Sequence, residues 1–143
     1  MQISIRHILE VKGYDFWNIG PDASVYDALR MMSIKDVGAL IVMQDDRMVG
    51  ILSERDYARK VVLLGKTSRE TLVSEIMSTN IFTIHPDQTV EEAMDMMTLK
   101  HVRHLPVVEN DKVLGIISIG DVVKSIIYKQ RQAIKDMEDK IIS

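Results

Sequence analysis

Hydrophobic positions along the chain change period in a fixed order, and that order occurs twice. In each copy a polar residue, Ser24 or Thr89, precedes a stretch with helical spacing, and an acid three residues later completes a capping-box pattern. Four apolar positions in each stretch follow the i, i+3, i+4, i+7 spacing of an amphipathic helix: Val25, Ala28, Leu29 and Met32, then Val90, Ala93, Met94 and Met97. The pattern therefore predicts one helix per copy, each burying a single face.

Two short apolar runs separated by polar turn residues follow each of these helices, which predicts a hairpin of buried strands. A second helix is expected after each hairpin, a short strand before each copy and a short helix before that strand. The tail places apolar residues at roughly helical spacing and predicts a long amphipathic helix. The expected elements are helices 5–9, 55–64, 73–77 and 120 onward, and strands 16–19, 39–43, 48–52, 81–84, 105–108 and 113–117.

The two copies form an ungapped internal repeat. Pro21–Asp56 recurs as Pro86–Asp121, and 15 of the 36 aligned pairs are identical. A repeat of this kind predicts two similar units. Since about 60 residues bury little apolar surface, we expect the copies to share one core. The predicted fold is α+β, with two strand–helix–strand–strand–helix units related by a pseudo-twofold axis. Unit boundaries are placed at 1–65 and 66–128, with a helical extension at 129–143.

The composition of the chain argues against several classes of function. The chain has 143 residues, 46% of them hydrophobic and 27% charged, a net charge of −3 and no cysteine. The charge argues against nucleic acid as a partner, and the absence of a long apolar run or signal-peptide layout argues against a membrane. A cytoplasmic location is expected. No nucleophile–base pair, metal cluster or complete phosphate loop is evident, so we expect no enzyme activity.

The most specific motif is Gly50-Ile-Leu-Ser-Glu-Arg-Asp56, which matches Gly115-Ile-Ile-Ser-Ile-Gly-Asp121. A strand here ends in serine, and an aspartate follows in the first turn of a helix. The helix N-terminus and the serine hydroxyl offer donors to a phosphate, and the carboxylate accepts hydrogen bonds from ribose hydroxyls. Ser-x-x-acid is also a capping box. The residues alone leave a ligand site and a cap equally supported.

Residues 1–125 resemble a tandem pair of CBS domains, an arrangement called a Bateman module, of the kind found in stand-alone bacterial proteins. The likeness is carried by the Pro-Asp-x-(Ser/Thr)-Val helix starts, the paired Gly-Ile-x-Ser-x-x-Asp motifs, Val102-Arg-His-Leu-Pro-Val-Val108 and the entry helix Val73-Ser-Glu-Ile-Met77. The resemblance implies a regulatory module that binds AMP, ADP, ATP, NAD or S-adenosylmethionine in clefts between the halves and associates as a homodimer.

The same resemblance assigns residues to two clefts. One would use Ser53, Arg55 and Asp56, completed by Phe82, Val102 and Arg103, and the other would use Ser118, Gly120 and Asp121, completed by Trp17, Val37, Gly38 and His104. Because Arg55 is replaced by Gly120 and Gly38 by Arg103, we expect the two clefts to differ in affinity or ligand. The leading function is therefore an adenine-nucleotide sensor in signal transduction. The alternative is a constitutive dimeric scaffold whose clefts are degenerate.

Overall fold

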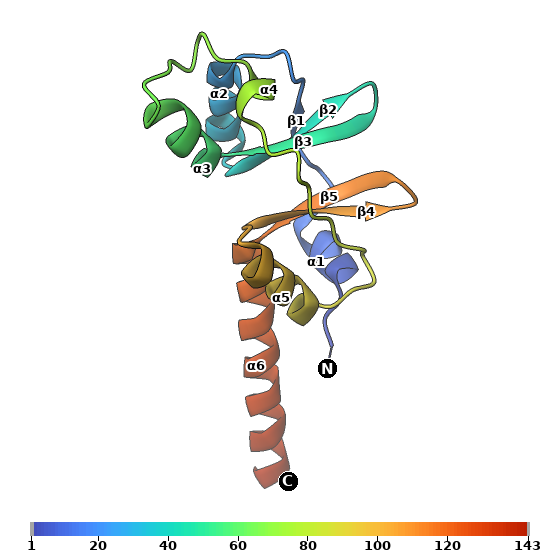
Figure 1. The fold of residues 1–143 in the computed structure, drawn as a ribbon. Coiled ribbons are helices and arrows are strands. Elements are labelled where there is room, and N and C mark those ends of the chain that lie inside the picture. The colour runs from blue at the N-terminus through green and yellow to red at the C-terminus, as the bar shows by residue number, and fades with distance from the viewer. Residues whose placement is uncertain (1, 143) are drawn as a thin grey trace. The chain divides into compact units, whose positions relative to one another are not determined.

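The computed structural model describes residues 2–142, which form two compact units. One unit consists of residues 16–81, and the other combines residues 2–15 with 82–142. The first is called the 16–81 unit below and the second the terminal unit. Figure 1 follows the chain through both, coloured by residue number.

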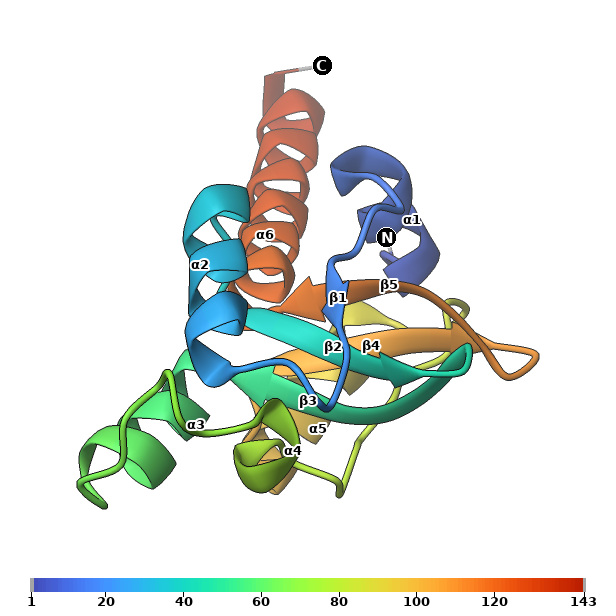
Figure 2. The ribbon, with the colours of Figure 1, turned by 90° about the horizontal axis from the view of Figure 1, so that it is seen from above.

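The 16–81 unit is built on a three-stranded sheet, which Figure 2 shows from above. Its strands β1 (Asn18–Ile19), β2 (Ala39–Gln44) and β3 (Arg47–Ser53) lie in the order β1-β2-β3, with β1 parallel to β2 and β2 antiparallel to β3. The helices are α2 (Val25–Lys35), α3 (Glu54–Tyr57), which continues as a π-helical turn η1 (Ala58–Val62), and α4 (Val73–Ile76).

The terminal unit repeats this plan on a two-stranded sheet. Strands β4 (His104–Glu109) and β5 (Lys112–Ser118) pair antiparallel. Helices α1 (Ile5–Lys12), α5 (Val90–Lys100) and α6 (Ile119–Ile142) accompany them. The helices predicted from Val25 and Val90, both hairpins and the long tail helix are confirmed. So is the α+β class, with helices and small sheets mixed in each unit.

Turn chemistry explains why the two hairpins are so alike. Each turn has two central residues with φ between 51° and 62°, Asp45 and Asp46 in one hairpin and Asn110 and Asp111 in the other. Asn and Asp are the residues that tolerate this left-handed region best after glycine, and a two-residue loop of this kind matches the twist of paired strands. The side chains that flank the turns therefore keep the same register in both copies.

The strand predicted over 81–84 is reduced to a single bridge between Ile84 and Val107. In the first copy the N–H of Ile41 donates to the carbonyl of Trp17 over 3.2 Å and extends the pairing of β1 with β2. The equivalent of Ile41 in the repeat is Pro106, which has no N–H to donate. The missing donor explains why the predicted short strand before the second copy does not form.

Each entry helix packs on the copy that does not follow it in the sequence. Helix α1 precedes the first copy but lies in the terminal unit, where Ile5 and Arg6 donate backbone hydrogen bonds to Gln88 and Pro86 over 2.9 and 2.8 Å. Helix α4 precedes the second copy, yet Val73 donates to Ala23 over 2.8 Å. The compact units are therefore divided differently from the boundaries 1–65 and 66–128, which assigned the entry helix to the first copy.

Apolar side chains form one core cluster within each unit, and a core shared by the two copies stays a prediction. One cluster joins Ile5 and Leu9 of α1 to α5, β4 and β5, and the other joins Val73 and Ile76 of α4 to α2, β2 and β3. An entry helix completes each cluster because a copy alone offers too few apolar residues to cover its sheet.

The two motif glycines, Gly50 and Gly115, let the entry helices approach the strands. A Cβ on Gly50 would lie 2.6 Å from the sulfur of Met77, and one on Gly115 would lie 2.9 Å from Cδ2 of Leu9. Both distances are shorter than van der Waals contact. The glycines of the repeated motif are therefore explained by packing and need no ligand.

Replacing Gly115 by alanine is expected to lower the free energy of unfolding by about 1–3 kcal/mol, since an added methyl group overpacks the contact with Leu9. Gly20→Ala is the matched control, because nothing lies within 4 Å of the Cβ it would add. Chemical denaturation of the two variants beside the parent measures the difference. Equal stabilities would show that α1 does not press against β5.

Candidate functional site

The repeated Ser-x-x-Asp motif forms a strand–helix junction in both units. In the 16–81 unit the N–H of Ser53 donates to Oδ2 of Asp56 over 2.9 Å, and the N–H of Asp56 donates to Oγ of Ser53 over 3.2 Å. In the terminal unit the corresponding distances between Ser118 and Asp121 are 2.8 and 3.2 Å. The capping interpretation of the motif is thus confirmed, and each carboxylate is held at the first turn of a helix.

The cap uses only Oδ2 of each aspartate. The two junctions differ in the partners of the other oxygen, Oδ1. Oδ1 of Asp56 lies 3.3 Å from Nζ of Lys60 and accepts a hydrogen bond from the hydroxyl of Ser78 over 3.4 Å. Lys12 donates to Oδ2 of Asp121 over 2.7 Å, the same oxygen that caps α6. Among residues 2–142, none donates a hydrogen bond to Oδ1 of Asp121. The junction of the terminal unit therefore has an acceptor in reserve.

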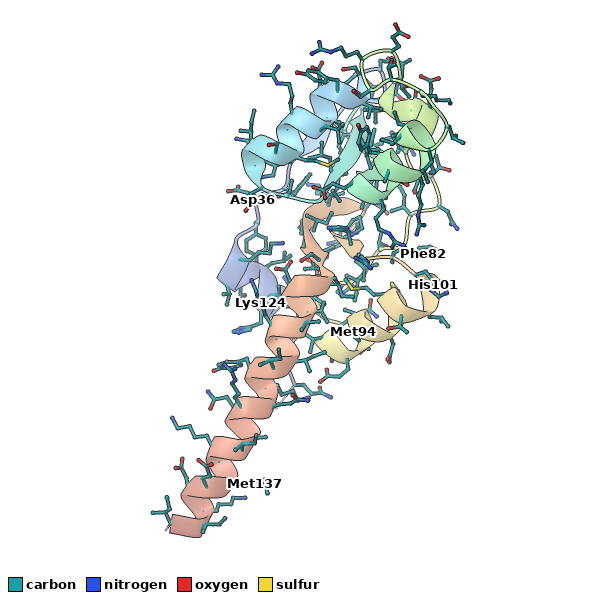
Figure 3. All side chains as sticks on the ribbon, turned by 90° about the vertical axis from the view of Figure 1, so that its left-hand side faces the viewer. Asp36, Phe82, Met94, His101, Lys124 and Met137 are labelled. Carbon is teal, nitrogen blue, oxygen red and sulfur yellow. The ribbon has the colours of Figure 1, made fainter. Side chains whose placement is uncertain are left out.

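Asp121 and Lys12 also line a cavity of about 520 Å³ between α1 and α6, inside the terminal unit. Its wall combines apolar side chains of α1 with polar groups of both helices, and Lys124, labelled in Figure 3, is one of them. The lining residues are Ile3, His7, Ile8, Val11, Lys12, Asp121, Lys124, Ser125 and Tyr128. A cavity of this size with apolar walls and a few charged groups is typical of small-molecule sites.

Electrostatics around Asp121 favour the ionised form. Burial raises the pKa of the Asp121 carboxyl, but the hydrogen bonds from Lys12 and from the backbone of Ser118 outweigh it, so the pKa lies below its usual value. The side chain is 19% exposed. Asp121 is therefore a carboxylate at neutral pH and stays available as a hydrogen-bond acceptor.

His104 lies beside this pair at the start of β4. Burial lowers the pKa of His104, and the positive charges of Lys12 and Arg103 lower it further, while Asp121 opposes them. His104 is thus neutral at pH 7. Its neighbour Arg103 is exposed and accepts a backbone hydrogen bond from Ile119 over 2.8 Å.

The free energy of unfolding is expected to decrease as the pH is lowered, because of His104. A histidine whose pKa is lower in the fold than in the unfolded chain takes up its proton more readily when unfolded, so stability is lost as pH falls below the ordinary value of about 6.5. His104→Gln removes this titration, whereas His101→Gln, at an exposed helix end, is the control. Denaturation midpoints measured between pH 7 and pH 5 should fall less in the first variant than in the second. Equal slopes would contradict the assignment.

The structure gathers the predicted site residues within each unit. In the 16–81 unit the carbonyl of Gly38 accepts from the N–H of Glu54 over 3.1 Å, so Val37 and Gly38 lie beside the Ser53 junction. In the terminal unit His104 pairs with Ser118, which brings Val102 and Arg103 beside that junction. The resemblance instead predicts that Val102 and Arg103 complete the cleft of Ser53, and that Val37 and Gly38 complete the cleft of Ser118. This exchange between the copies stays a prediction.

The remaining predicted site residues are two aromatic side chains, one arginine and one glycine. Trp17 and Phe82 occupy equivalent places in the repeat, and a lysine covers each ring, with Nζ of Lys35 at 4.1 Å and Nζ of Lys100 at 5.2 Å from the ring centre. Cation–π contacts of this kind keep a ring face and a positive charge together. Arg55 is half-buried in α3, and Gly120 is exposed in the first turn of α6.

Lys12 is the site residue that sequence reasoning missed. It lies 109 positions from Asp121, and no motif contains it. Its role depends on α1 packing into the terminal unit, where Arg6 anchors the helix through ion pairs of 3.1 Å with Asp87 and 2.9 Å with Glu109. Only that long-range packing identifies Lys12.

Comparisons with known proteins divide the chain at the sequence repeat, each match beginning near an entry helix. The family model for the CBS domain matches residues 3–63 and 73–128. A CBS domain-containing protein of Arabidopsis thaliana, CBSX3, mitochondrial, is 37% identical over 119 residues, which are 80% of this chain and 58% of that protein. The chain therefore spans less than two thirds of that relative.

Solved structures agree in fold. The CBS-domain structure NE2398 is 43% identical with a TM-score of 0.85, covering 89% of this chain and 99% of the other. A signal-transduction protein with CBS domains from Burkholderia ambifaria MC40-6, described as putative, is 42% identical with a TM-score of 0.85, covering 89% and 96%. The CBS pair of the protein MJ0100, solved with 5-methylthioadenosine and S-adenosyl-L-methionine, is 22% identical with a TM-score of 0.80, covering 90% and 99%, and supports the fold.

Proposed function

Because the chain belongs to the CBS-domain family, as a tandem pair of CBS domains, we propose that it is a regulatory module that binds an adenine nucleotide at its Ser-x-x-Asp junctions. The observation that carries this proposal is the junction of the terminal unit. There an ionised carboxylate with an unused oxygen, a lysine and a helix N-terminus line a cavity large enough for a nucleoside.

Each part of a nucleotide has a counterpart in these residues. The free Oδ1 of Asp121 accepts hydrogen bonds from adjacent ribose hydroxyls, and carboxylate acceptors make stronger bonds than neutral ones. The ammonium groups of Lys12 and Lys124 provide positive charge for a phosphate. Apolar residues that line the same cavity, such as Ile8 and Val11, are proposed to contact the base. AMP, ADP, ATP, NAD and S-adenosylmethionine share this adenosine chemistry.

The two junctions are proposed to bind with unequal affinity. Both oxygens of Asp56 already have partners in the 16–81 unit, so a ribose must displace Lys60 or Ser78. Asp121 offers Oδ1 without displacing any described residue. The terminal unit is therefore the stronger site.

Binding transmits a signal if the nucleotide prefers one arrangement of the protein over another. No catalytic step is assigned to either junction, since one oxygen of each carboxylate caps a helix. The module is proposed to act through an associated partner, as a homodimer in the cytoplasm. Among the helices of residues 2–142, none combines the length and the hydrophobicity that a membrane-spanning segment needs.

A constitutive scaffold is the second candidate, and the 16–81 unit favours it. The complete hydrogen bonding of Asp56 is what a degenerate cleft would show, because nothing there remains for a ligand to satisfy. A thermal-shift panel with AMP, ATP, NAD and S-adenosylmethionine separates the candidates. A midpoint that rises with the concentration of one nucleotide supports the sensor, since a ligand that binds only the folded state stabilises it. No rise with any of the four supports the scaffold.

A further inference from the structure

Helix α6 carries an apolar face that nothing in the terminal unit covers. From Ala133 to Ile142 every residue is exposed, and the exposed fractions of Ile134, Met137 and Ile141 are 57%, 64% and 83%. Figure 3 shows this end of α6, with Met137 labelled, extending away from the other elements of its unit. A helical segment of ten solvent-exposed residues has little stability of its own in water, because helices of this length are stabilised mainly by packing against a partner.

The spacing of this face is that of a coiled coil. Its residues alternate steps of four and three and all lie on one line along the helix: Val123, Ile127, Gln130, Ile134, Met137 and Ile141. A strict 3.5-residue repeat keeps a seam facing one partner helix, which an ordinary amphipathic surface helix does not require. With Ile127, Ile134 and Ile141 at position a, the other three residues take position d.

Charges beside the seam identify the partner and its direction. Arg131 and Glu138 both take position e. Two antiparallel copies of this helix bring position e against position e, so Arg131 of each copy meets Glu138 of the other. Two parallel copies bring position g against e, which would place Ile126 against Arg131 and Ala133 against Glu138, with no opposite charges. The pattern is complementary to itself in the antiparallel direction alone.

We propose that the exposed end of α6 binds the same segment of a second copy of this chain as an antiparallel coiled coil, with Ile134 of each copy packed against Met137 of the other. A lipid surface fits the segment less well. Residues 128–142 mix Lys129, Arg131, Lys135 and Lys140 with Asp136, Glu138 and Asp139, whereas helices that lie on membranes have a basic polar face.

The proposal is independent of nucleotide binding, and the lack of cysteine allows a direct test. Full-length Ile134→Cys and Met137→Cys, one carrying a size tag, are mixed under oxidised glutathione. The mixed disulfide dimer is expected to exceed either self-linked dimer several-fold. Self-linking of Ile134→Cys in excess would show parallel helices and overturn the proposal. Yields no higher than those of Lys135→Cys, on the outer face, would also overturn it.

Charge reversal provides a second measurement, by sedimentation of the full chain at several concentrations. Arg131→Glu is expected to weaken self-association about tenfold or more, and adding Glu138→Arg is expected to restore it. Lys135→Glu, which makes the same charge change away from the seam, should leave it unaltered. Unchanged association in Arg131→Glu, or binding of the parent to phosphatidylglycerol vesicles as a monomer, would overturn the proposal.

Discussion

Leu9→Ala is expected to lower the free energy of unfolding by about 2–5 kcal/mol, the usual cost of truncating a fully buried leucine. Leu9 is 1% exposed and belongs to the core cluster of the terminal unit, where its side chain fills the space left by Gly115. The loss combines the transfer of three carbon atoms from the core with the cavity that they leave. Such a cost is a large part of the total stability of a small protein.

Val11→Ala is the matched control for this prediction. Val11 lies two residues further along α1 and is 76% exposed, so its truncation should change the free energy of unfolding by less than about 0.5 kcal/mol. Urea denaturation of both variants gives the two values. Similar small losses would mean that α1 does not complete the core of the second copy.

Asp121→Asn is expected to weaken nucleotide binding roughly 10- to 100-fold, because the loss of a charged acceptor costs about 1.5–3 kcal/mol. The substitution keeps the shape of the side chain and an oxygen that accepts from the N–H of Ser118. It removes the negative charge that holds Lys12 and meets the ribose. The free energy of unfolding without ligand is measured in parallel, so that a loss of affinity is separated from a loss of the cap.

Asp56→Asn distinguishes the two junctions. Since Lys60 and Ser78 already engage Oδ1 of Asp56, this site contributes little binding and its substitution should lower the measured affinity by less than about threefold. Equal losses in Asp56→Asn and Asp121→Asn, measured with the same nucleotide, would contradict the ranking of the sites.

The sequence predicts the elements well where their cause is local. Helix α2 follows from the spacing of Val25 and Ala28 behind the cap at Ser24, and the hairpins follow from apolar runs around turn residues. The failure at residues 81–84 also has a local cause. Pro106 removes the donor that the paired strand needs, and this proline is visible in the sequence.

The packing of α1 on the second copy and of α4 on the first could not be predicted. Helices of eight and four residues carry too few apolar positions to specify the copy on which they pack. Only the fit of Leu9 against Gly115, and of Met77 against Gly50, selects the copy on which each packs. For the same reason the motif identified Ser118 and Asp121 but missed Lys12. A contact between residues 109 positions apart depends on the finished core.

Calorimetric titration of Asp121→Asn beside Asp111→Asn, with the nucleotide that gives the largest thermal shift, tests the central claim most directly. Asp111 lies in the turn at the opposite end of β5 from Asp121, and asparagine suits its positive φ of 62°. We predict parental affinity in Asp111→Asn and a dissociation constant roughly 10- to 100-fold higher in Asp121→Asn. Parental affinity in both variants would show that the junction of the terminal unit does not hold the nucleotide.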